Sequence, residues 1–259
     1  MQLNTTVCQF NIRVCRWGGC PRRYQERIMM PCILHIETST GVCSTAVSHN
    51  GLCLFNREDY SGPNHAERLG TFVDEALAFV DSSGLSLDAV AVSGGPGSYT
   101  GLRIGVSMAK GICYGRDLKL ISVPTTELLC VPVLLGEEEL PENALLCPMI
   151  DARRMEVYAT LYDRSLRVVR ATSADVVEAD TYREWLDKAP VYFFGNGATK
   201  CMDRIAHENA RLIEGVEPLA QWMCAPAEKR LLGGETEDVA YYEPFYLKNF
   251  VAQMPKKLL

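Results

Sequence analysis

One stretch of the sequence, residues 89–114, has the features of a buried strand, a glycine-rich turn and a helix in direct succession. Residues 89–92 are apolar and partly β-branched, which is typical of a strand inside a sheet. Pro96 and Gly97 suit a tight turn, because proline fixes φ and glycine tolerates positive φ. A strand that passes through such a turn into a helix is a building block of α/β folds, so this stretch predicts that class.

The glycine-rich turn has two interpretations. A helix that begins after such a turn offers backbone N–H groups to a phosphate, and Gly95, Gly97, Ser98 and Thr100 would line the resulting phosphate loop. Ser98 and Thr100 are also the candidate N-caps of the helix. The alternative is a tight strand-to-helix turn that binds no ligand.

The helix that follows carries small residues at every fourth position. We expect it to run from Gly101 to about Tyr114, with Gly115 as its C-cap. Gly101, Gly105 and Ala109 then form a smooth stripe along one face, against which a second helix could pack closely. If the stripe docks a partner, Gly105→Leu blocks association more than it unfolds the protein. The stripe could also pack within the chain's own core.

The first half of the chain alternates strands and helices in a clear order. Hydrophobic periodicity predicts a meander of three strands, with the pair Asn50-Gly51 as a hairpin turn, followed by alternating helices and strands. The expected strands are 33–36, 42–47, 52–55, 89–93 and 118–123, and the expected helices are 65–80, 101–114 and 125 to about 132.

A second series of elements follows an acidic loop at residues 137–141. We therefore predict an actin-like ATPase (ASKHA) fold of two related α/β subdomains, residues 30–136 and 137–259, with the C-terminal tail returning to the first. In the second subdomain the expected strands are 145–150, 155–162 and 191–194, the expected helices are 180–187 and one from about 199, and residues 233–259 are expected to be loop.

Residues 1–29 show no hydrophobic period and contain five Arg but one Glu. An Arg-rich, acid-poor leader resembles a transit peptide, although the Ser richness and the amphipathic face of such peptides are missing. We expect instead that synthesis starts at Met29 or Met30, directly before the first strand. Mass spectrometry of the native N-terminus would distinguish the two.

The charge of the chain argues against direct nucleic-acid binding. The formal net charge is −6, and because residues 1–29 contribute +4, the rest carries −10. Binding to nucleic acid depends on contacts between cations and phosphates, so an acidic body needs a basic partner for any role on RNA. No apolar run reaches the roughly 20 residues of a membrane helix. The eleven cysteines include no Cys-x-x-Cys pair, and we expect reduced, mostly buried thiols in a cytoplasmic protein.

No set of residues in the sequence predicts an enzyme. His65 begins the run His-Ala-Glu-Arg-Leu, which lacks the His-Glu-x-x-His spacing of a metalloprotease, so we expect a capping or packing role. Ser98 has no evident His and acid partners for a hydrolase triad. The turn at residues 151–154, with one Asp and two Arg, is either a solvated turn or a salt-bridged surface. We predict no catalytic and no metal-binding residues.

Several motifs stand out when the chain is taken as a whole. They are Ile36-Glu37-Thr38-Ser39-Thr40, the run at 65–69, the glycine motif at 95–105, Asp151-Ala152-Arg153-Arg154 with residues 155–158, Gly195-Asn196-Gly197-Ala198, and Tyr246-Leu247-Lys248. Together they resemble the TsaB (YeaZ) family of bacterial tRNA threonylcarbamoyladenosine biosynthesis proteins. The resemblance covers about residues 31–248, and the glycine motif is its most specific part.

The resemblance implies an actin-like fold without catalysis of its own. The family is a non-catalytic relative of TsaD, the metal-dependent subunit that transfers threonylcarbamoyl to adenosine 37 of tRNAs reading codons that start with A. TsaD-like proteins carry a His-x-x-x-His pair where residues 123–128 lie here, and those residues include no His. Glu37 stands where actin-like ATPases usually carry Asp, which argues against ATP hydrolysis. The chain is expected to act as an accessory subunit with TsaD and TsaE; the alternative is an M22-type metallopeptidase or a stand-alone ATPase.

The resemblance also implies pairing through the helices at 65–80 and 101–114, with a TsaD-like subunit or, when the protein is alone, with a second copy. It implies no cofactor in the isolated chain, leaves a nucleotide at a partner interface open, and brings tRNA in only through the complex. The residues expected to dock are Leu69, Phe72, Val73, Ala76, Gly101, Leu102, Gly105 and Ala109.

Overall fold

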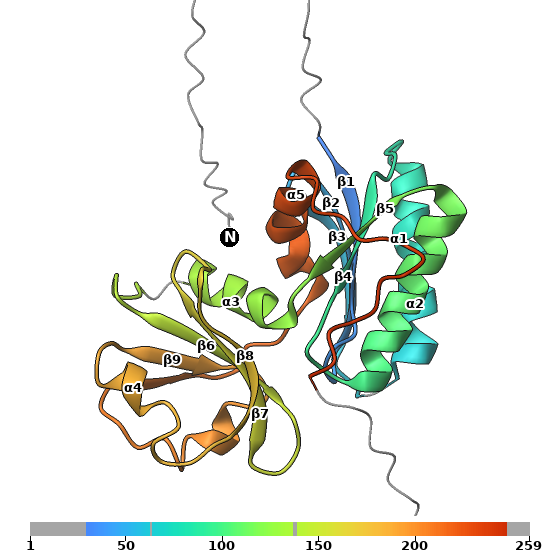
Figure 1. The fold of residues 1–259 in the computed structure, drawn as a ribbon. Helices are drawn as coiled ribbons and strands as arrows, with labels where there is room; N and C mark the ends of the chain where they lie inside the picture. The colour runs from blue at the N-terminus through green and yellow to red at the C-terminus, as the bar shows by residue number, and fades with distance from the viewer. Residues whose placement is uncertain (1–29, 63, 137–138, 248–259) are drawn as a thin grey trace, which may run out of the picture.

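Two lobes, each with its own five-stranded sheet, make up the computed structural model, which describes residues 30–62, 64–136 and 139–247 (Figure 1). Residues 1–29 lie outside the described residues, so the start of synthesis stays a prediction. Within the described part of the chain, no helix has both the length and the apolar character needed to cross a bilayer.

The first sheet has the strand order β3-β2-β1-β4-β5. β1, β2 and β3 form an antiparallel meander, and its β2–β3 turn is the predicted Asn50-Gly51 pair, in which both residues have positive φ. β4 and β5 continue the sheet in parallel on the other side of β1. The strands are β1 (Cys32–Glu37), β2 (Cys43–His49), β3 (Leu52–Asp59), β4 (Ala89–Ser93) and β5 (Lys119–Val123).

The second sheet repeats this topology. From its own first strand, β6, an antiparallel meander runs through β7 to β8, and β9 and β10 extend the sheet in parallel on the other side, in the order β10-β9-β6-β7-β8. The prediction of two related α/β halves is therefore confirmed. The strands are β6 (Leu145–Asp151), β7 (Glu156–Asp163), β8 (Val168–Val176), β9 (Val191–Phe194) and β10 (Ala210–Ile213).

The helices are unequal in the two lobes. α1 (His65–Ser82) and α2 (Tyr99–Arg116) cover the outer face of the first sheet, and their apolar sides share a core with β1 and β4 (Figure 1). The corresponding elements of the second lobe are only α4 (Arg183–Leu186) and a 3-10 turn at Thr199–Cys201. α3 (Thr125–Leu135) packs on the second sheet.

The chain returns to the first lobe after β10. A 3-10 turn at Ala220–Met223 leads into α5 (Cys224–Leu232), and both pack on the inner face of the first sheet. The N–H of Ala220 donates to Ser44 Oγ on β2 (2.9 Å). Further on, the N–H of Glu237 donates to the carbonyl of Leu120 on β5 (2.8 Å). Two of the three helices on the first sheet thus precede the second lobe in sequence, and the third follows it.

Several element predictions for this fold were wrong. The predicted helices at 180–187 and from 199 shrink to the short turns given above, and β8, β10 and α5 were not predicted. α3 continues through Pro132 to Leu135, because its apolar side chains pack on the second sheet. α2 ends at Arg116, with Asp117 in a left-handed conformation as its cap in place of Gly115.

Candidate docking face and glycine loop

The glycine loop, residues 94–98, joins the carboxyl end of β4 to α2. Its backbone is tied to the neighbouring elements: the N–H of Gly94 donates to the Val123 carbonyl on β5 (2.8 Å), and the N–H of Phe245 donates to the Gly94 carbonyl (2.8 Å). Gly95 has a φ of +96°, and a Cβ there would lie 2.8 Å from the Phe245 carbonyl oxygen. This position therefore requires glycine for its conformation and for the close passage of the C-terminal segment.

The turn between β1 and β2 presses on the loop. The N–H of Ser98 donates to the Ser39 carbonyl (2.7 Å), and a Cβ at Gly97 would lie 2.5 Å from the same oxygen. Ser98 is the N-cap of α2, and its hydroxyl accepts from the N–H of Gly101 (3.2 Å). Because backbone meets backbone here, no phosphate fits between Gly97 and Ser39. The geometry favours the interpretation of a strand-to-helix turn without a ligand.

The stripe of Gly101, Gly105 and Ala109 faces inward. A Cβ at Gly101 would lie 2.1 Å from the Thr38 carbonyl oxygen, and a Cβ at Gly105 would lie 2.3 Å from Thr38 Oγ1. The Thr38 hydroxyl also donates to the Gly101 carbonyl (2.7 Å). The stripe thus allows a close approach of the chain's own β1–β2 turn. The expectation that Gly105→Leu mainly blocks association is wrong, because the new side chain would displace Thr38 and disrupt the fold.

The other residues expected to dock lie mostly on the same inner side. Phe72 is half-buried and packs against the core of the first lobe, while the rest are buried. A partner cannot reach their side chains in this fold, so the individual assignments are corrected, while docking through α1 and α2 stays a prediction. The buried residues are Leu69, Val73, Ala76, Gly101, Leu102, Gly105 and Ala109.

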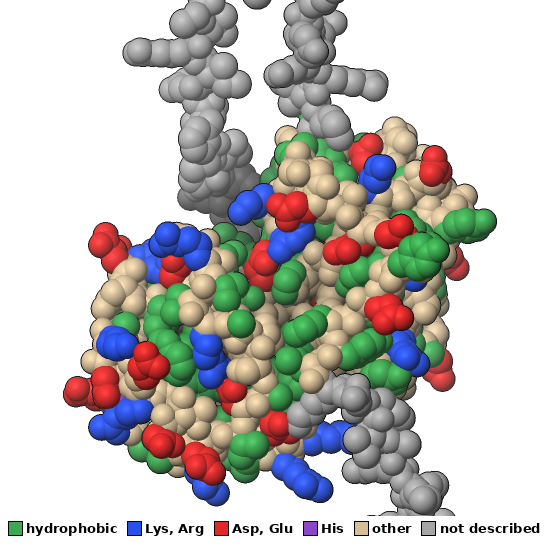
Figure 2. All heavy atoms as spheres, in the orientation of Figure 1, with side chains coloured by type: hydrophobic (Ala, Val, Ile, Leu, Met, Phe, Trp, Pro, Cys, Tyr) green, Lys and Arg blue, Asp and Glu red, His purple; other side chains and the backbone are tan. Residues whose placement is uncertain are grey.

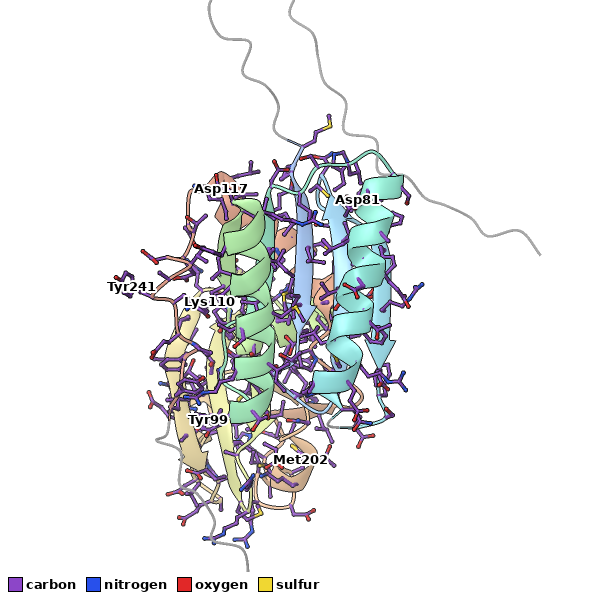
Figure 3. All side chains as sticks on the ribbon, turned by 90° about the vertical axis from the view of Figure 1, so that its right-hand side faces the viewer. Asp81, Tyr99, Lys110, Asp117, Met202 and Tyr241 are labelled. Carbon is purple, nitrogen blue, oxygen red and sulfur yellow. The ribbon has the colours of Figure 1, made fainter. Side chains whose placement is uncertain are left out.

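The outward side of the two helices carries an open groove. α1 and α2 lie side by side and nearly parallel on this face (Figure 3). The groove has a volume of about 850 Å³ and runs along α2, starting from Thr100, a residue predicted to line a phosphate loop. Its lining residues are Ala66, Tyr99, Thr100, Arg103, Ile104, Ser107, Met108, Gly111 and Ile112.

A second set of small residues follows this outward side of α2. Ser107, Gly111 and Gly115 repeat at every fourth position and are exposed. A Cβ at Gly111 or Gly115 would meet nothing within 4 Å. Beside them, Ile104 and Met108 are half-buried apolar side chains. Smooth backbone next to apolar side chains is what a closely packing helix requires. The same four-residue spacing in the sequence could have found this set, which our prediction missed.

The C-terminal segment and one cation border the groove. Lys110 Nζ donates to the carbonyls of Ala240 (2.9 Å) and Tyr242 (3.1 Å), which holds this segment along α2. The Arg103 guanidinium lies 4.2 Å from the centre of the Tyr99 ring. A hydrogen bond with Tyr246 raises the pKa of Arg103, so the groove keeps a fixed positive charge at this end.

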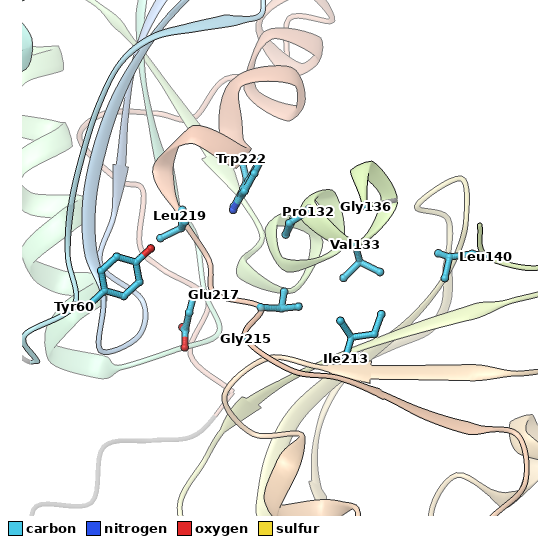
Figure 4. A pocket seen from close by; sticks show the side chains of 11 residues that line it. Tyr60, Pro132, Val133, Gly136, Leu140, Ile213, Gly215, Glu217, Leu219 and Trp222 are labelled. Carbon is cyan, nitrogen blue, oxygen red and sulfur yellow. The ribbon is translucent and has the colours of Figure 1, made fainter. Parts of the chain in front are cut away.

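A second cavity, of about 250 Å³, lies between the lobes (Figure 4). Most of its lining is aliphatic, and Trp222 closes one side. Its one carboxylate, Glu217, has a pKa raised by burial. The lining residues include no Lys or Arg, so this cavity offers no cation to a nucleotide phosphate.

Comparison with known proteins places the chain in a family. The model of the TsaD family, tRNA N6-adenosine threonylcarbamoyltransferase, matches residues 59–254. The tRNA threonylcarbamoyladenosine biosynthesis protein TsaB of Bacillus subtilis is 31% identical over 222 residues, which cover 83% of this chain and 93% of that protein. The chain belongs to the TsaB family. TsaB of Haemophilus influenzae is 29% identical over 231 residues, 85% of this chain and 94% of that protein.

Solved structures extend the TsaB-family likeness to the fold. A Pseudomonas aeruginosa protein described as similar to the peptidase YeaZ superposes with a TM-score of 0.73 at 24% identity, over 85% of this chain and all of that one. YeaZ of Pseudomonas aeruginosa gives a TM-score of 0.71 at the same identity. The predicted actin-like fold of two related subdomains is confirmed.

The residues that could carry chemistry in this TsaB-family chain are held by structural contacts. His65 Nε2 donates to the Thr40 carbonyl (2.7 Å), which confirms its packing role. Glu127, in the segment where TsaD-like proteins carry the His pair, is paired with Arg230 (2.6 Å). Asp151 is paired with Lys200 and does not pair with the neighbouring arginines. Within the described ranges, no three or more His, Cys, Asp or Glu side chains are grouped to hold a metal ion.

Glu37 is the one fully buried carboxyl at the end of β1. Burial raises its pKa to about 7, and hydrogen bonds with Ser39 and Ser93 oppose the rise. One carboxyl oxygen accepts from the N–H of Ser39 (2.5 Å), which turns the group toward its own chain. Glu37 therefore stabilises the β1–β2 turn that presses on the glycine loop.

Proposed function

We propose that this TsaB-family protein is a non-catalytic accessory subunit in the transfer of threonylcarbamoyl to adenosine 37 of tRNAs that read codons starting with A. It pairs with a TsaD-like catalytic subunit, works with a TsaE-like ATPase and forms a homodimer when alone. The observation that carries the proposal is the outward groove of α1 and α2, where exposed glycines lie beside apolar side chains.

The chemistry of the groove suits a helical partner. Gly111 and Gly115 let another backbone approach closely, because no side chain of this chain lies above them. Ile104, Met108 and Ile112 supply apolar area whose burial stabilises the complex by about 25 cal/mol per Å². Arg103 at one end of the groove would select an acidic or carbonyl-rich contact on the partner.

An accessory role fits the charge of the molecule. On the face shown in Figure 2, acidic and basic side chains are interspersed over both lobes and form no broad basic area. With a net charge of −6 for the whole chain, tRNA is expected to bind only through the complex. The same role places the protein in the cytoplasm, away from membranes.

The test is reconstitution of the transfer reaction. TsaD-like and TsaE-like proteins are mixed with threonylcarbamoyl-AMP, ATP and tRNA, with or without this chain, and the modified nucleoside is quantified. We expect product only when the chain is present, and none when it is the sole protein. Undiminished transfer without it would refute the accessory role. Metal analysis that finds one tightly bound zinc or iron per chain would favour the metallopeptidase alternative.

A further inference from the structure

Two cysteines from distant parts of the sequence meet on the first lobe. Cys53 lies near the start of β3, opposite Ser48 of β2 in the sheet register, and Cys224 is the first residue of α5. A hydrogen bond joins the two thiols side chain to side chain. Of the eight cysteines within the described residues, Cys53 is exposed and the other seven are buried.

The contact is fixed by the packing of α5. Ala227, one turn after Cys224, belongs to the apolar core on the inner face of the first sheet. The β2–β3 turn touches the same helix, because a Cβ at Gly51 would lie 2.5 Å from Glu228 Oε2. The two sulfur atoms are thus held together by ordered elements on both sides.

The environment gives the two thiols different roles. The hydrogen bond from Cys224 lowers the pKa of Cys53 to about 7, against the opposing effects of partial burial and of Glu58. The same hydrogen bond, together with burial, raises the pKa of Cys224. Cys53 is therefore an accessible thiolate near neutral pH, and Cys224 keeps its proton.

We propose that Cys53 and Cys224 form a reversible disulfide that ties α5 to the β2–β3 edge of the first sheet. A hydroperoxide is the oxidant. The Cys53 thiolate attacks one peroxide oxygen, the O–O bond breaks, and Cys53 becomes a sulfenic acid as hydroxide leaves when the oxidant is hydrogen peroxide. Cys224 sulfur then attacks Cys53 sulfur, the S–S bond forms, the S–O bond breaks, and the Cys224 proton leaves with the hydroxyl group as water.

The disulfide requires little movement of the chain. The sulfurs must close from hydrogen-bonding distance to about 2.05 Å, which side-chain rotation can supply. The crosslink joins residues far apart in the sequence, so it restricts the unfolded chain and stabilises the oxidised form. A small-molecule thiol reverses it by attack on the exposed Cys53 sulfur.

Peptide mapping of the full-length protein tests the disulfide. The folded protein is treated with hydrogen peroxide, blocked with an alkylating agent and digested with trypsin without reduction. We expect residues 28–57 crosslinked to residues 212–229, with the mass of both peptides less two hydrogens, and loss of the crosslink after dithiothreitol. Because the first peptide also contains Cys32 and Cys43, fragment spectra must place the bond on Cys53.

Cys53→Ser is the matched variant, and because Cys53 is exposed the variant is expected to fold. It should abolish the crosslink, and the rise in melting temperature that oxidation gives the wild type should disappear with it. Buried Cys113 and Cys130 should stay reduced in both proteins. Absence of the crosslink in folded, peroxide-treated wild type, or its persistence in Cys53→Ser, would overturn the proposal.

Discussion

At the scale of single residues, the buried carboxyl of Glu37 couples the fold to pH. Burial raises its pKa from 4.5 to about 7. Between these two pH values the folded protein keeps a proton that the unfolded chain has already lost. Stability from this group therefore falls as the pH rises from about 4.5 to about 7, and is constant above that range.

Glu37→Gln should remove this loss, since the amide stays neutral. We expect the variant to gain stability relative to the wild type as the pH rises, by an amount on the order of 3 kcal/mol above neutral pH. Urea denaturation of both proteins between about pH 5 and pH 8 measures the difference. Buried His35, whose pKa is lowered to about 3, destabilises both proteins as the pH falls below its ordinary value of 6.5, so it cancels in the comparison.

Glu67→Gln, which changes an exposed carboxylate on α1 to the same amide, controls for the substitution itself. A stability difference between Glu37→Gln and the wild type that stays flat over the whole pH range would show that Glu37 ionises normally in the fold.

Glycine illustrates how far single residues are predictable from this sequence. The four-residue spacing predicted a close-packing stripe on α2, and the structure confirms close packing at Gly105. It did not indicate which face the stripe occupies, because glycine has no side chain whose polarity marks the inside or the outside. Gly111 and Gly115 follow the same spacing and face solvent.

At the scale of elements, α5 is joined to α3 by an ion pair. The Arg230 guanidinium donates to both Glu127 carboxylate oxygens (3.0 and 2.6 Å), and each side chain is 17% exposed. Because α3 packs on the second sheet and α5 on the first, this pair connects the two lobes.

A double-mutant cycle with Arg230→Met and Glu127→Gln should give a coupling energy of about 1–2 kcal/mol. Each single variant leaves a half-buried charge without its partner, whereas the double variant removes both charges. Equilibrium unfolding of the four proteins measures the coupling. Additive single effects, with no coupling, would mean that the pair does not hold α5 to α3.

The elements differ in how much the sequence revealed. The first meander and α1 were predicted because their hydrophobic periods are long and regular. β8 was missed because its burial alternates weakly at the sheet edge, and β10 because it has only four residues. α5 was missed because it buries only Cys224, Pro226 and Ala227, and its packing depends on a sheet far away in the sequence.

At the scale of the whole molecule, duplication has left two lobes with different uses. Both sheets share one topology, but only the first carries two 18-residue helices on its outer face. The second lobe has a four-residue helix and a 3-10 turn in the same places. A helical docking surface is therefore available on the first lobe, which agrees with the proposed pairing through α1 and α2.

The most direct test of that pairing is the affinity of Gly111→Leu for the TsaD-like subunit, measured by calorimetric titration. The new side chain enters open space in the groove, and leucine favours a helix over glycine by about 1 kcal/mol, so the variant should be folded. Ala225→Leu, the same kind of enlargement at an exposed position of α5, is the matched control. We predict that Gly111→Leu binds at least about tenfold more weakly than the wild type, while Ala225→Leu binds normally. A folded Gly111→Leu variant with wild-type affinity would contradict docking through the outward face of α1 and α2.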